Sequence, residues 1–136
     1  MYHRQRWTPE KIKQRLELIA PLVYIKSASL PSFRYRELDG PTTYAPIETN
    51  ADDSSWQKIS ANEYWGKWKQ DFIFRTTFTV PNDWDKTKPI ALYLPFGEAG
   101  DFSHPEALAY IDEGPYATCD RHHQEILLKP EWADGK

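Results

Sequence analysis

The sequence predicts a mainly β fold, an antiparallel β-sandwich preceded by an N-terminal α-helix. Short apolar stretches alternate with turn residues at intervals of roughly ten residues, which is typical of sandwich strands. The chain has 136 residues, of which 40% are hydrophobic and 15% aromatic. That size and composition suit one packed domain. We divide the chain into a helical segment, residues 1–22, and a sandwich domain, residues 23–136.

The helix is predicted to begin at Thr8-Pro9-Glu10. Thr suits the N-cap, Pro the first helical position, and Glu the positive first turn. Apolar residues then recur at spacings of four and three, which places them on one helix face: Ile12, Leu16 and Ile19. Pro21 should end the helix. We expect the apolar face to dock on the helix's own domain or on a neighbour, because it is too short for membrane binding.

Residues 22–60 contain few local signals. A short strand is predicted over residues 22–25. Beyond it the prolines and polar turn residues indicate extended chain, and its scattered aromatic residues indicate that the chain wraps a core. No motif is placed in this stretch.

The remaining strands are predicted over residues 72–80, 90–94, 107–111, 116–119 and 126–128. The first of them alternates Phe, Thr and Val with other residues at period two, which indicates one buried face. Their number and spacing predict an antiparallel sandwich, and we expect one of the jelly-roll or galactose-binding-like type.

A turn and a polar run separate the last three strands. The turn Asp112–Pro115 contains Gly114, which we expect to supply a positive φ. The run Asp120–Glu125 holds more polar side chains in a row than a turn needs. These residues either bind something or satisfy one another at the edge of a core. The structural or interface candidates are Asp120, Arg121, His123 and Glu125. We expect Arg121 to pair with Asp120 or Glu125, or with another domain, because a guanidinium can satisfy a carboxylate and carbonyls together.

Composition excludes several classes of protein. A net charge of −3 argues against nucleic-acid binding, because phosphate affinity needs a basic face. No stretch approaches the ~18 apolar residues of a membrane span. Cys119 is the only cysteine, so no internal disulfide is possible, and MYHRQRW has no apolar run behind it to form a signal peptide. We expect a cytoplasmic location without membrane contact.

The candidate chemistry is sparse. No pair of carboxylates stands out for glycoside hydrolysis, and Cys119 with His122 lacks an orienting third group. The adjacent His122 and His123 would point to opposite faces of a strand, so they do not suit one metal ion. We therefore assign no catalytic residue, no metal site and no cofactor to this chain. Trp65 and Trp68 are candidates for stacking on a sugar ring, although both also suit packing.

Three segments resemble a known family. The phrase Phe74–Pro81 followed by Trp84 resembles sandwich domains that precede the catalytic parts of glycoside hydrolases. Together with Ala109–Asp112 and Asp120–Leu128, it resembles the N-terminal region of family 38 α-mannosidases of the cytosolic and bacterial type.

The resemblance implies a non-catalytic first domain of a longer enzyme that hydrolyses terminal α-mannosides. Such a domain packs on the catalytic domain of the same polypeptide and supports assembly, which allows a homo-oligomer. Zinc is expected in that catalytic domain, whose ligands resemble His-x-Asp-Thr-Ala-Trp, and no His-x-Asp occurs here. Two alternatives stay open: a carbohydrate-binding sandwich module, free-standing or from another glycoside hydrolase such as a family 2 β-glycosidase, and a self-sufficient hydrolase.

Overall fold

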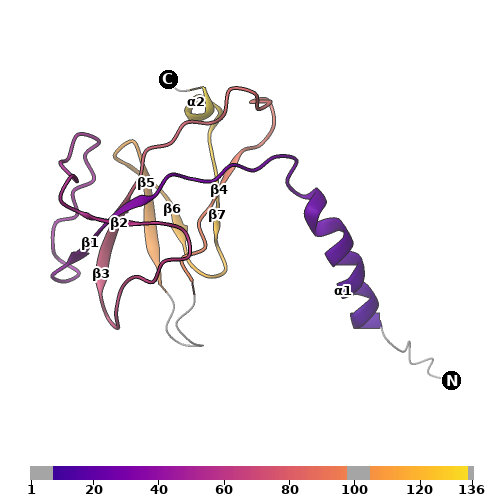
Figure 1. Cartoon of the computed structure of the whole chain (residues 1–136), viewed down its shortest axis with the longest axis horizontal. Helices are drawn as coiled ribbons and strands as arrows, with labels where there is room; N and C mark the ends of the chain where they lie inside the picture. The colour runs from indigo at the N-terminus through magenta and orange to yellow at the C-terminus, as the bar shows by residue number, and fades with distance from the viewer. Residues whose placement is uncertain (1–7, 98–104, 135–136) are drawn as a thin grey trace.

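The computed structural model describes residues 8–97 and 105–134. The described chain is built mainly of short strands, with a helix standing apart at one end (Figure 1). Its elements in order are α1 (Thr8–Ile19), the 3-10 turn η1 (Ala20–Leu22), β1 (Phe33–Leu38), β2 (Gln57–Ile59), β3 (Asp71–Arg75), β4 (Ala91–Tyr93), β5 (Ala107–Ile111), β6 (Gly114–Cys119), β7 (Glu125–Leu127) and α2 (Pro130–Ala133).

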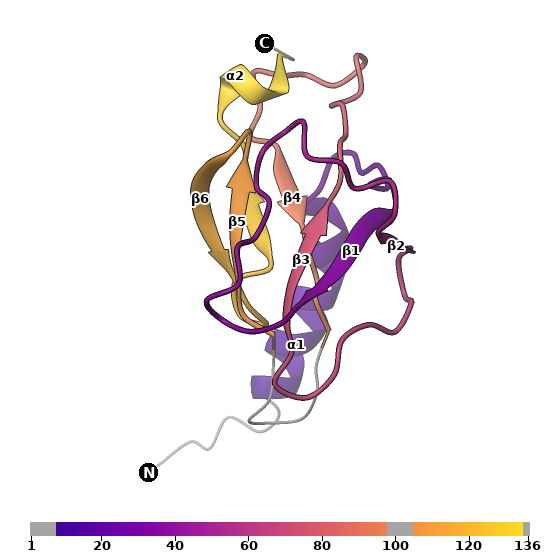
Figure 2. The same ribbon diagram turned by 90° about the vertical axis from the view of Figure 1, so that its left-hand side faces the viewer.

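The strands form small antiparallel sheets. One has the order β2-β1-β3, and the others are the pairs β4-β7 and β5-β6. Figure 2 shows β5 and β6 to one side of β4, with β3 and β1 on the other. The predicted mainly β, antiparallel architecture with an N-terminal helix is confirmed. The sheets of the described chain stay small and do not close on one another.

The core lies where the sheets and α2 meet. Its central cluster is Val80, Ile90, Leu128 and Ala133, with Phe78, Trp84, Leu92, Ile111 and Trp132 packed against it. Ile126 and Cys119 are also buried, at 2% and 1% exposure. Side chains of β4, β5 and α2 and of the chain between β3 and β4 therefore share one interior, which joins the β4-β7 and β5-β6 pairs.

Several predicted elements correspond closely to observed ones. The helix begins at Thr8 and ends before Pro21, and the hairpin strands β5 and β6 cover the predicted ranges. The strand predicted over 72–80 is shorter: β3 ends at Arg75, although Phe78 and Val80 still pack in the core.

The strand predicted over residues 22–25 is wrong. Leu22 ends the turn η1, and Val23, Tyr24 and Ile25 are exposed, at 66%, 52% and 85%. β-branched and aromatic residues favour strands only where a neighbouring strand completes the ladder. The described chain offers none at this point, so the segment remains irregular.

The hairpin turn between β5 and β6 uses different residues from those predicted. Gly114 does not have a positive φ; Asp112 and Glu113 do, at 47° and 71°. Two consecutive positive φ values suit the tight turn that joins the paired residues Ile111 and Gly114. Glu113 is held there by Thr49, whose backbone N–H and hydroxyl donate to the Glu113 carboxylate at 2.8 and 2.9 Å. The same hydrogen bonds lower the pKa of Glu113.

Helix α1 does not dock on the strands of its own chain. Within residues 8–97 and 105–134 it packs only on η1, and Figure 1 shows it apart from the sheets. Its apolar face is exposed, with Ile12 at 52%, Leu16 at 56% and Ile19 at 53%. Of the two expected partners of this face, the strands of its own chain do not contact it in the described residues, and a neighbour stays a prediction.

Candidate functional site

Trp65, one of the two predicted sugar-stacking residues, is a packing residue. Its ring makes edge-on contacts with Phe72 and Phe74, at centroid distances of 4.8 and 4.7 Å. Tyr35 and Phe96 lie slightly farther away, at 6.0 and 6.2 Å. These rings form a half-buried aromatic cluster over β1 and β3, and edge-to-face pairs of this kind stabilise the fold beyond their buried area.

Trp68 has the opposite environment. It is 73% exposed, and Tyr64 nearby is 90% exposed. The segment between them turns sharply, with φ of 73° at Gly66, and Lys67 pairs with Glu37 of β1 at 2.8 Å. Trp68 therefore stays available for a ligand or another domain, whereas Trp65 does not.

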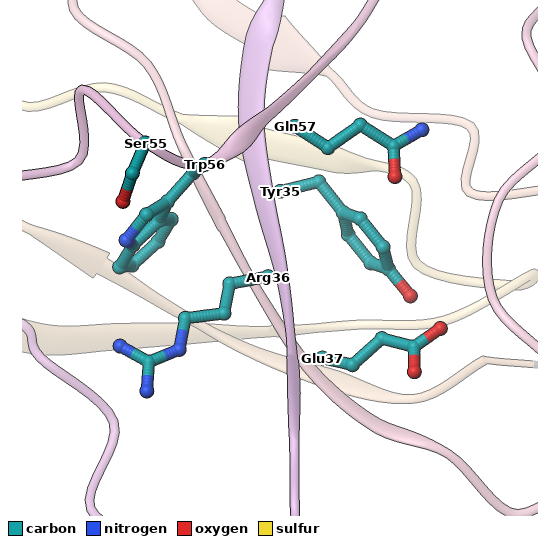
Figure 3. Close-up of a pocket in the computed structure, with 6 residues that line it drawn as sticks. All are labelled: Tyr35, Arg36, Glu37, Ser55, Trp56 and Gln57. Atoms are coloured by element: carbon teal, nitrogen blue, oxygen red, sulfur yellow. The ribbon is translucent and has the colours of Figure 1, made fainter.

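A shallow, open pocket of about 370 Å³ lies where β1 continues past the end of β2. Its lining is Tyr35, Arg36, Glu37, Ser55, Trp56 and Gln57. Figure 3 shows the side chains of Ser55, Trp56 and Arg36 on one side of the β1 ribbon and those of Tyr35, Glu37 and Gln57 on the other. The β1–β2 ladder ends at the pair formed by Tyr35 and Gln57, and beyond it this edge of β1 has no strand partner among the described residues.

The tryptophan of this pocket contacts two arginine side chains of the same chain. Arg36 and Arg75 each place a guanidinium 5.8 Å from the centre of the Trp56 ring. Arg75 also donates to the carbonyl oxygens of Pro46 and Thr49, at 3.1 and 3.2 Å. Because Trp56 is only 7% exposed and lies under these cations, it serves to hold the long loop rather than to stack on a sugar.

The tyrosine of the pocket, Tyr35, has a buried hydroxyl without a hydrogen-bond partner among the described residues. Burial raises the pKa of Tyr35, and the negative charge of Glu37 raises it further. A hydroxyl kept protonated in this way cannot act as a base. The pocket lacks the paired carboxylates that glycoside hydrolysis needs, since Glu37 is its single acid.

The polar run between β6 and β7 satisfies itself. One Asp120 carboxylate oxygen accepts from the backbone N–H groups of His122 and His123, at 2.6 and 2.7 Å, and lies 3.0 Å from His123 Nδ1. The hydrogen bond with the His123 ring, followed by the backbone donors, lowers the pKa of Asp120 to about 2. Asp120 therefore closes the turn, as aspartate commonly does.

Arg121 does not pair with either predicted acid. Its Nε donates to Nε2 of His122 at 3.0 Å. Asp120 is occupied by the turn, and Glu125 lies exposed on β7, where it faces Tyr93 across the ladder. The expected pairing of Arg121 with Asp120 or Glu125 is not observed, because His122 and His123 donors occupy the Asp120 carboxylate. The alternative, a partner in another domain, stays a prediction.

No metal or nucleophile site is assembled among the described residues. No group of three or more His, Cys, Asp or Glu side chains there could hold an ion, and His3 and His104 lie outside the described ranges. Burial, and to a smaller extent Asp120, raises the pKa of Cys119, so its thiol stays protonated and unreactive. Among the described helices none has the length and apolar character to cross a membrane.

Comparison with known proteins adds no relative: no family model, no curated protein and no solved structure matches the chain. The pocket residues on β1 and β2 were missed by the sequence analysis. One signal was present, since aromatic and arginine residues alternate at period two from Phe33 to Arg36, as in a strand.

Proposed function

We propose that this chain is a non-catalytic N-terminal domain of a family 38 α-mannosidase, with a jelly-roll or galactose-binding-like sandwich. In this role it packs on the catalytic domain of the same polypeptide and supports its assembly. The observation that carries the proposal is a pair of outward apolar side chains on one strand: Leu108 and Tyr110 of β5 are 50% and 42% exposed. Surfaces of this kind mark contacts with other domains.

The chemistry of the polar run supports the same role. The residues that carry the family resemblance include Asp120 and His123, and these are consumed in a turn that orients β7. A residue whose hydrogen bonds are all directed at its own loop shapes a surface rather than reacting with substrate. On this proposal zinc belongs to the catalytic domain of the parent enzyme.

The packing is tested by mixing this chain with a family 38 catalytic region produced without its own N-terminal domain. We expect a one-to-one complex in size-exclusion chromatography with light scattering, and we expect Leu108→Glu to abolish it. Leu18→Glu is the matched control, because Leu18 is 75% exposed on α1, away from the sheets. A chain that forms no complex, or whose complex survives Leu108→Glu, would contradict the proposal.

The absence of catalysis is tested separately. The purified chain supplied with zinc should release no product from aryl α-mannosides above the buffer rate. Turnover that copurifies with the chain and is lost on changing Glu37→Gln would instead favour a self-sufficient hydrolase.

A carbohydrate-binding module is the second candidate, and the exposure of Trp68 and Tyr64 is the observation that favours it. An aromatic ring that stacks on a sugar needs an accessible face, and Trp68 is far more exposed than the partly buried Trp65. On the preferred proposal, calorimetric titration with mannose gives no saturable binding. Saturable binding in the micromolar range that Trp68→Ala abolishes would place the binding module first.

A further inference from the structure

Two apolar surfaces of this chain are uncovered and complementary. The first is the N-terminal arm, which we define as residues 8–25. The second is the outer face of the β4–β7 pair, which comprises Ala91, Tyr93, Glu125 and Leu127. Figure 1 shows α1 apart from the body, on the side where β4 and β7 lie.

The arm presents a narrow apolar stripe with basic borders. At about 100° per residue along an α-helix, Ile12, Leu16 and Ile19 fall within one stripe. On the same geometry Lys13 borders the stripe on one side and Arg15 on the other. All three apolar residues are more than half exposed. An exposed apolar stripe of this kind indicates a surface that contacts another molecule or domain.

The outer face of the β4–β7 pair is apolar with an acidic member. Tyr93 is 57% exposed and Leu127 is 58% exposed, whereas Ile126 between the outward residues is buried. In the ladder Ala91 lies opposite Leu127 and Tyr93 opposite Glu125. A helix laid across this face would meet a tyrosine ring and a leucine beside one carboxylate.

The charges of the two parts are opposite. The arm, residues 8–25, carries three basic and two acidic side chains, a net charge of +1, and residues 1–7 before it add two arginines. Residues 26–136 carry a net charge of −6. A basic arm is attracted to an acidic body, and opposite charges at a contact fix its register and speed association.

We propose that two copies of this chain exchange their N-terminal arms, each α1 covering the outer β4–β7 face of the other. Ile12, Leu16 and Ile19 pack on Tyr93 and Leu127 of the second copy, and Arg15 reaches its Glu125. The arm leaves its own body at Lys26, whose ammonium bonds to the carboxylate and carbonyl of Asp83, both at 2.7 Å. From there α1 extends outward instead of folding back.

A second copy is the occupant that the size of the contact favours. A 12-residue helix is about 18 Å long, so one helix-on-sheet contact is smaller than the ~1,200 Å² of a specific interface. Reciprocal exchange makes two identical contacts in one dimer, as two-fold symmetry requires, and covers both apolar surfaces of each copy. Arm exchange is the means by which this domain supports assembly in the proposed function. It depends on that proposed function only for its biological setting.

The test is the molar mass of the full chain by light scattering and sedimentation velocity over a range of concentrations. We expect twice the 16.0 kDa of one chain at tens of micromolar. Leu16→Glu on the arm and Leu127→Glu on the sheet should each raise the dissociation constant at least ~30-fold, the effect of losing one central contact. Leu18→Glu, on the other side of α1, should leave the dimer intact.

A charge exchange tests which surfaces meet. Arg15→Glu and Glu125→Arg should each weaken the dimer, and the double variant should recover most of the loss, because both reciprocal pairs are restored. A chain that stays monomeric at all concentrations overturns the proposal, including one whose α1 folds onto its own sheet. A dimer that is insensitive to Leu16→Glu and Leu127→Glu overturns it equally. Neither result bears on complex formation through Leu108, so the two proposals fail separately.

Discussion

The strand body and the N-terminal arm use the same apolar residues in opposite ways. In the body, Val80, Ile90 and Ile126 are 6%, 8% and 2% exposed. In the arm, Ile12, Leu16 and Ile19 are all more than half exposed, although their spacing is that of a buried helix face. Periodicity thus reports that a face is to be covered, and it leaves open which molecule covers it.

The largest expected difference in the free energy of unfolding is between the alanine variants of two tryptophans. Trp56→Ala should lower the free energy of unfolding by about 3–5 kcal/mol, because a buried ring is lost from beneath Arg36 and Arg75. Trp68→Ala should change it by less than ~0.5 kcal/mol, because its ring is mostly in solvent. Urea unfolding followed by far-ultraviolet circular dichroism measures both. Equal losses for the two variants would remove the distinction between them.

The next comparison sets one isoleucine of the body against one of the arm. Ile126→Ala should cost about 2–4 kcal/mol, since the side chain is fully enclosed. Ile19→Ala should cost less than ~0.5 kcal/mol when the protein is dilute enough to be monomeric. A large cost for Ile19→Ala under those conditions would show that the arm packs on its own body.

The hairpin turn allows a smaller test of backbone strain. At Glu113, φ is 71°, where glycine is favoured over other residues by about 1 kcal/mol. Glu113→Ala removes the hydrogen bonds to Thr49 but keeps the backbone strain. Glu113→Gly also removes the hydrogen bonds, and it relieves the backbone strain. We therefore expect Glu113→Gly to unfold at a higher temperature than Glu113→Ala. The reverse order in thermal unfolding would mean that the strain at this turn is negligible.

The smallest effect is a pH dependence. Hydrogen bonds in the folded state lower the pKa of Asp120 from its usual 3.8 to about 2. The stabilisation from this carboxylate is therefore complete above pH 4 and is lost as the pH falls through about 2. Asp120→Asn should flatten the fall of the melting temperature between pH 4 and pH 2. Glu131→Gln, which removes an exposed carboxylate outside the turn, should leave that fall unchanged.

The correct sequence predictions share a local cause. Thr8 and Pro9 mark the start of α1, and Pro21 marks its end within a few residues. Residues 107–111 were predicted as a strand with the bounds of β5, because a turn and a polar run enclose them. Signals of this kind act over a few residues, so a single sequence contains them.

The wrong predictions depend on distant partners. Glu113, which has a positive φ, is bound by Thr49 from 64 residues away. β1 pairs with β2 and β3, which follow it only after a long, proline-rich connection. The short alternating pattern of β1 alone therefore did not predict a strand there. The pocket at the end of β2 likewise exists only once the register of that ladder is set. Arg121 is the exception, because the backbone N–H groups that bind Asp120 belong to His122 and His123, only two and three residues along the chain.

The most direct test of the contrast between arm and body is hydrogen exchange measured at two protein concentrations. Amides of α1 should exchange rapidly when the chain is dilute and become protected at tens of micromolar, while protection of β1 and β3 stays constant. That result follows if the body folds alone and the arm is covered by a second copy. Protection of α1 that is the same at both concentrations would contradict the account.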